Sequence, residues 1–223
     1  VEEGRRTYAN IMKYLRMGTS SNFGIMLSMA VDSLFIPFLP LTPIQVLLNN
    51  LLYDLSEVGI PYDTVARGET RRPHGWEMSE LLRYTLVMGP LSSLFDIATF
   101  LILLYGFGAS AETFRTAWFV ESMATQVLVI FLIRTAAPAW SSRPHPFLVA
   151  TSLSALAVAL LLALTPLGHW FGFAPVGAPI LLTIAALVVG YLAAAEALKH
   201  MALKRRRHRF GLPGAGPPHG RRH

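Results

Sequence analysis

The sequence predicts an all-α membrane protein, a polytopic bundle of six transmembrane helices in which the first helix extends as a cytosolic stalk. Hydrophobic residues make up 53% of the 223 residues and charged residues only 14%, a balance that is rare in water-soluble globular domains. About six apolar stretches approach the roughly 20 residues that cross a bilayer as a helix. These stretches lack the two-residue alternation of β-barrel strands.

The first predicted helix begins before the membrane, because apolar residues recur at helical spacing among basic ones between residues 8 and 17. Its small polar residues between Gly18 and Gly24 are expected to face the second span. Three prolines between 37 and 43 then end the helix and turn the chain. The fifth and sixth spans carry few polar side chains beyond Ser and Thr and read as scaffold. The predicted spans are 22–39, 42–62, 84–107, 114–133, 147–167 and 178–198.

Basic residues set the orientation of these spans, because they favour the cytoplasmic side of short loops. Every Lys and Arg except Arg115 falls on one side of the predicted bundle, so we expect both termini to be cytoplasmic. Residues 1–205 are predicted to form one domain, and 206–223 a basic, Gly- and Pro-rich disordered tail. This topology explains the net charge of +6 without a nucleic-acid partner, and the tail is expected to lie against anionic lipids.

Polar side chains interrupt the second, third and fourth spans. Such ionisable groups cost at least about 2.5 kcal/mol at bilayer depth, so they are functional candidates. They supply oxygen ligands, which Mg²⁺ and Ca²⁺ prefer, and the chain has no cysteine for a thiolate site. Asn50, Asp54 and Glu57 follow one helical stripe. The predicted metal ligands are Asn22, Asn50, Asp54, Asp96 and Glu121, with Glu57 as a further candidate.

Several of these polar residues have a structural alternative. Glu57 lies about a turn from the cytosolic end of its span, so a place in an entry funnel or on the surface is as well supported as a ligand role. Glu121 is either a ligand or a protonated group that hydrogen-bonds its surroundings. Asp32, near the exterior end of the first span, is expected to be solvated. Hydrogen bonds between helices are the favoured role of the remaining candidates, Ser92, Ser93, Thr125 and Gln126.

Four stretches together resemble the C-terminal membrane region of bacterial magnesium-translocating P-type ATPases: "EGRRTYANIMKYLRMGTSSNFG", "FLPLTPIQVLLNNLLYDLSEVGIPYD", "GPLSSLFDIATF" and "WFVESMATQVLVIFLIRT". The resemblance runs from about residue 3 to about residue 205. It implies that the six spans are the fifth to tenth helices of a ten-helix pump, that residues 3–22 are its stalk, and that the transported ion is Mg²⁺. It assigns ligand roles to Asn22, Asn50 and Asp54, and an acidic position to Asp96.

The resemblance also implies partners that this sequence does not contain. The sequence lacks an Asp-Lys-Thr-Gly phosphorylation motif, the nucleotide-binding and actuator domains, and the first four helices. We therefore expect no catalytic residue here and no ATP hydrolysis by this chain alone; ATP would act through the missing N-terminal half. The expected location is the bacterial inner membrane. The alternative is a free-standing six-helix channel, carrier or scaffold, although the abrupt start "VEEGRRTYAN" favours a part of a longer pump.

Overall fold

A computed structural model describes residues 2–65, 78–135 and 138–209. Every regular element in these ranges is helical, so the all-α prediction is confirmed for them. The long helices are α1 (Glu2–Phe35), α2 (Pro43–Glu57), α4 (Met78–Leu101), α5 (Ala111–Ile133), α6 (Pro146–Leu164) and α7 (Ala178–Arg209). Shorter helical turns connect them: η1 (Ile60–Tyr62), η2 (Ile102–Gly106), η3 (Ala139–Ser141) and η4 (Pro166–Phe171). The tail predicted at 206–223 lies outside the described residues beyond Arg209.

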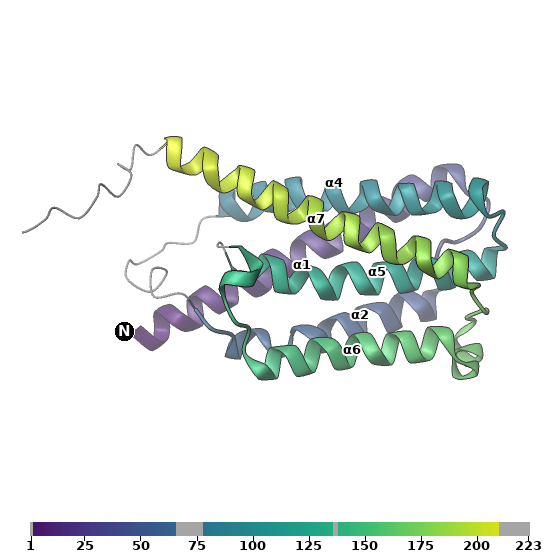
Figure 1. The fold of residues 1–223 in the computed structure, drawn as a ribbon, viewed down its shortest axis with the longest axis horizontal. Helices are drawn as coiled ribbons and strands as arrows, with labels where there is room; N and C mark the ends of the chain where they lie inside the picture. Colours follow the sequence, from purple (N-terminus) through teal and green to yellow (C-terminus); the bar gives the residue numbers. More distant parts are fainter. Residues whose placement is uncertain (1, 66–77, 136–137, 210–223) are drawn as a thin grey trace, which may run out of the picture.

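The six long helices alternate in direction along one bundle (Figure 1). The start of α1, the end of α2 and the carboxyl end of α7 lie at the same end, on the left of Figure 1. Four helical stretches are long and apolar enough to cross a membrane: Leu81–Gly106, Ala111–Ile133, Pro146–Leu164 and Ala178–Lys199. The described parts of α1 and α2 do not meet this criterion. The structure thus supports a multi-pass membrane protein, and the count of six spans stays a prediction.

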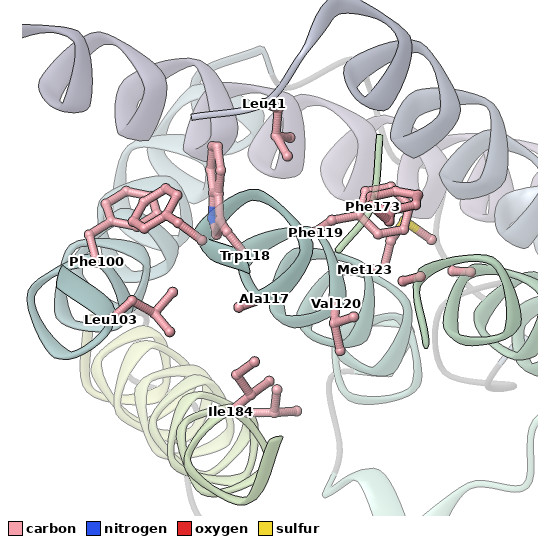
Figure 2. Packing of buried hydrophobic residues seen from close by; sticks show 14 of the residues in the cluster. Leu41, Phe100, Leu103, Ala117, Trp118, Phe119, Val120, Met123, Phe173 and Ile184 are labelled. Carbon is pink, nitrogen blue, oxygen red and sulfur yellow. The ribbon is translucent and has the colours of Figure 1, made fainter. Parts of the chain in front are cut away.

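Helix α5 forms the centre of the bundle. It contacts α2, α4, α6 and α7, and Phe114, Trp118 and Met123 on it are fully buried. Figure 2 shows Trp118 beside Phe100 of α4, and Phe119 beside Phe173 of the segment before α7. The Trp118 and Phe100 rings meet edge to face at 4.8 Å, a favoured aromatic geometry. Because α5 is buried on nearly all faces, contact with water does not explain the polar residues that it carries.

Helix α1 packs along α4, while α2 packs against α6 and α5. A side chain at Gly24 would meet the Ser92 Cβ at 3.2 Å, and Thr19 Oγ1 lies 3.2 Å from Thr85 Oγ1. Both positions therefore face α4 and not α2, contrary to our expectation for this stretch. Ser21, in contrast, lies beside Tyr53 of α2. Small residues permit this close approach of α1 to α4.

Candidate functional site

Asp96 lies in the interior of the bundle, where helices α1, α4 and α5 meet. Its carboxyl group is 3% exposed and accepts hydrogen bonds from Ser28 Oγ at 2.5 Å and from Trp118 Nε1 at 3.0 Å. These two donors come from α1 and α5. Asp96 therefore links three helices through its two oxygens, and both donors are uncharged.

Glu121 of α5 lies against Asp96, and its side chain is in hydrogen-bonding contact with it. Glu121 is 1% exposed, and its Oε2 has no partner among the described residues. Two carboxyl groups can share a hydrogen bond only when one of them carries a proton. No ion pair among the described residues reaches either side chain. The pair can therefore hold a proton or share a cation.

Ser93 extends this interior cluster as a link between helices. Its hydroxyl donates to the Gly24 carbonyl at 2.9 Å and lies 3.1 Å from Ser28 Oγ, so its expected structural role is confirmed. Thr125 and Gln126 instead bond within α5, to Glu121 and Ser122. The expectation that they join helices was wrong for these bonds, because a neighbouring turn of their own helix satisfies them first.

Asp32 was expected to be solvated, and this was wrong. It is 4% exposed, and its Oδ2 has no partner among the described residues. It stands one helical turn after Ser28, on the α1 face that packs toward α4, and that packing covers it.

The other predicted ligands lie on the surface of the described bundle. Asn22, Asn50 and Asp54 are exposed, whereas Asn49 and Glu57 are buried at 2% each. The stripe predicted along α2 therefore divides: Asn50 and Asp54 face outward, and Glu57 turns inward near α1. Whether these residues bind one ion together with Asp96 stays a prediction. No group of three or more His, Asp or Glu residues closes into a metal site within the described ranges.

A groove of about 310 Å³ lies between the first part of α1 and the end of α2. Asp54 and Glu57 line it from α2, and Asn10 and Tyr14 line it from α1. Burial raises the pKa of the Tyr14 hydroxyl, and the neighbouring charges of Glu57 and Asp54 raise this pKa further. Two acidic side chains thus line the groove, and no Lys or Arg is among its lining residues.

Asp63 centres a buried ionic cluster just beyond η1. Its Oδ2 lies 2.9 Å from Lys13 Nζ, its Oδ1 lies 3.1 Å from Arg134 Nη1, and the His145 backbone N–H donates to Oδ1 at 3.3 Å. Burial alone would raise the pKa of the Asp63 carboxyl, but the Lys13 hydrogen bond and charge, the Arg134 charge and the His145 amide together lower it. The cluster ties α1, α5 and the segment before α6 to one carboxylate.

Our reading of the sequence missed this cluster, because Lys13, Asp63 and Arg134 are far apart along the chain. One sequence feature could have indicated the cluster. Asp63 comes directly after the second predicted span, on the side of the bundle that carries most of the basic residues. An acid there is most easily buried when basic groups surround it.

Comparison with known families identifies the family of this bundle. Residues 38–201 match the family described as "Cation transporting ATPase, C-terminus". This chain belongs to that family. The resemblance read from the sequence is thereby confirmed, and the matched range of the cation transporting ATPase C-terminus includes α2 and all four candidate spans.

Curated relatives within the family agree with this match. The chain is 38% identical over 204 residues to a magnesium-transporting ATPase, P-type 1, of Salmonella typhimurium, covering 89% of this chain and 23% of that protein. It is 36% identical over 205 residues to the protein of the same name from Escherichia coli K12, with the same coverages. A calcium-transporting ATPase of Bacillus subtilis is 27% identical over 187 residues, 78% of this chain and 21% of that protein. The chain thus spans less than a quarter of the length of these relatives.

Proposed function

We propose that this chain is the ion-translocating C-terminal part of a P-type ATPase that imports Mg²⁺ across the bacterial inner membrane. The observation that carries the proposal is a set of buried carboxyl groups, Asp96 and Glu121 above all, that no described Lys or Arg neutralises. Relatives of this family are named for the transport of magnesium or calcium, and both are hard cations that prefer oxygen ligands.

The proposed ligands are Asn22, Asn50 and Asp54 on the outward surfaces of α1 and α2, with Asp96 and Glu121 in the interior. Exposed amides and a carboxylate at membrane depth are costly against lipid. This supports the view that further helices, from a part of the pump that precedes this chain, cover this face and complete the coordination. Mg²⁺ keeps several waters and uses only one or two carboxylates in such sites, so the residues present are chemically suitable ligands.

Helices α1 and α2 are proposed as the two remaining spans. α2 has 15 residues, about 22 Å at 1.5 Å per residue, which is shorter than the roughly 30 Å of the hydrocarbon core. The non-helical segments that flank it are compatible with membrane depth only where protein or water covers them. A short helix with polar residues on its open face fits a span that lines an ion path.

The 34-residue helix α1 is proposed to couple the ion site to ATP. Its first part, up to about Asn22, would project into the cytosol as a stalk. Phosphorylation in the missing cytosolic domain would tilt this stalk, change the spacing of α1 and α2, and thereby release the ion. ATP and the catalytic groups would belong to that domain, and anionic lipids would bind the basic C-terminal segment.

The test is Mg²⁺ uptake by proteoliposomes that contain the full-length product of the native locus, with and without ATP. We expect ATP-dependent uptake that Asp54→Asn abolishes and that Glu112→Gln, at an exposed position at the start of α5, leaves intact. Equal uptake without ATP would favour the channel or carrier alternative. Uptake at the wild-type rate by the Asp54→Asn protein would remove Asp54 from the ion site.

A further inference from the structure

We propose that the groove between α1 and α2 holds a second divalent-cation site, formed by Asn10 Oδ1 and the Glu57 carboxylate with Asp54 at its edge. The site would share Asp54 with the proposed transport ligands and extend from it toward the end of the bundle where α1 begins. This second site would extend the proposed function. Only its role as an intermediate binding site on the ion path rests on that function. The binding site itself is argued from the groove alone.

Two orphaned oxygen atoms support a ligand in this groove. Asn10 Oδ1 and Glu57 Oε1 are buried atoms without a partner among the described residues, although the Tyr53 hydroxyl, one turn earlier on α2, contacts the Glu57 carboxyl group. Both residues are 2% exposed, and both line the groove. Buried polar atoms in folded proteins are nearly always satisfied, so two neighbouring exceptions on different helices indicate a bound ion or water.

The orientation of the Asn10 amide is fixed by its other bonds. Its Nδ2 donates to the Pro61 carbonyl at 2.8 Å and to the Asp63 carbonyl at 3.2 Å. The nitrogen is therefore committed to the segment after α2, and the remaining atom is an oxygen that can only accept or ligate. A cation meets this requirement, and an anion does not.

The charges around the groove distinguish a cation from a water molecule. Glu57 and Asp54 supply two carboxylates, and no Lys or Arg is among the residues that line the groove. Lys13, next to Tyr14 on α1, is already bonded to Asp63 and to the Thr64 carbonyl. Two carboxylates with one amide oxygen form the ligand set of a partly hydrated Mg²⁺ or Mn²⁺.

The size of the groove suits an ion that retains water. Its volume of about 310 Å³ compares with roughly 30 Å³ per water molecule in the liquid. Beside the groove, a Cβ atom at Gly18 would lie 3.9 Å from Glu57 Oε2, in ordinary van der Waals contact. Water molecules can thus complete the coordination that the three side chains begin.

Mn²⁺ binding to the full chain in nanodiscs of neutral phosphatidylcholine tests this site, with the electron paramagnetic resonance signal of free Mn²⁺ as the readout and Mg²⁺ as competitor. We expect Glu57→Gln to remove one bound Mn²⁺ or to weaken it by at least about tenfold, since even partners outside the ligand shell cost that much. The exposed Glu112→Gln should leave the binding curve unchanged. An identical curve for Glu57→Gln would overturn the proposal.

A second measurement locates the bound ion, because the chain contains no cysteine and accepts single labels cleanly. A fluorophore on Thr7→Cys, which lines the groove, should be quenched by Mn²⁺. The same label on Ser33→Cys, an exposed position near the other end of α1, should not be. Equal quenching at both positions would overturn the site. Normal ATP-dependent Mg²⁺ uptake together with such a negative result would refute the groove site and leave the proposed function standing.

Discussion

Asp63 and Asp96 are both buried carboxyl groups, and they differ in their partners. Asp63 contacts two cations, Lys13 and Arg134, whereas Asp96 accepts hydrogen bonds from the neutral donors Ser28 and Trp118 and lies against another carboxyl group. A buried charge that is fully paired holds helices together. A buried carboxyl group whose only partners are neutral hydrogen-bond donors can still bind a cation or a proton. Burial alone therefore does not distinguish a structural acid from a functional one.

The largest expected effect on stability comes from Asp63→Ala. It would leave Lys13 and Arg134 buried without their shared carboxylate, and breaking a buried pair in this way costs about 3–5 kcal/mol. Chemical denaturation of the purified chain in detergent micelles measures this loss, with the exposed Glu112→Ala as the matched control. A denaturation midpoint equal to that of wild type would mean that the cluster does not stabilise the bundle.

Lys13→Met should have a smaller effect, because Asp63 keeps Arg134 and the His145 amide. We expect a loss of about 1.5–3 kcal/mol, the contribution of a hydrogen bond to a charged group, by the same denaturation assay. A loss as large as that of Asp63→Ala would show that Arg134 contributes nothing without Lys13.

The pH dependence of stability provides a milder test of the same cluster. Because the pKa of Asp63 is lowered in the folded chain, its contribution is present above the unfolded pKa of about 3.9 and is lost as the pH falls through the folded value. The stability difference between wild type and Asp63→Asn should therefore be constant from about pH 6 to 8 and should shrink below about pH 4. A difference that is largest in acid would contradict this sign.

Glu121→Gln should change stability least. The glutamine amide can donate to Asp96 in place of the carboxyl proton, so we expect a change within about 1 kcal/mol, the usual net value of one hydrogen bond. Mg²⁺ uptake by the full-length protein should fall nonetheless, because a carboxylate is lost from the interior. A fall in stability as large as that of Asp63→Ala would assign the Asp96–Glu121 pair a structural role instead.

Most of the fold could be predicted from local patterns in the sequence. Runs of apolar residues predicted the helices, and the prolines before α2 marked the turn that follows α1. Four sequence stretches in the right order indicated the family. These signals are short-range, because a helix and its ends depend on residues within a few turns.

The candidate site was predicted less completely, since its geometry depends on how distant helices pack. Asp96 and Glu121 were both selected for lying within apolar spans, and the structure brings them together. Helical spacing placed Glu57 on one stripe with Asn50 and Asp54, yet the approach of α1 buries Glu57 alone. Nothing near Asp63 in the sequence indicates that Lys13 and Arg134 converge on it, because both contacts join residues at least 50 positions apart.

The attachments of α1 have a mechanical consequence. Near its start, Asn10 and Lys13 bind the segment around Asp63, and near its middle, Gly24 and Ser28 bind α4. Between these anchors, Thr19 donates to the carbonyl of Leu15, a type of bond that favours bending in helices. Because α1 is held at two points, it cannot slide along its axis. A force on its first turn would therefore rotate the helix about the nearer attachment. We expect α1 to bend in the stretch between these two attachments, where the Thr19 hydroxyl also lies 3.2 Å from Thr85 of α4.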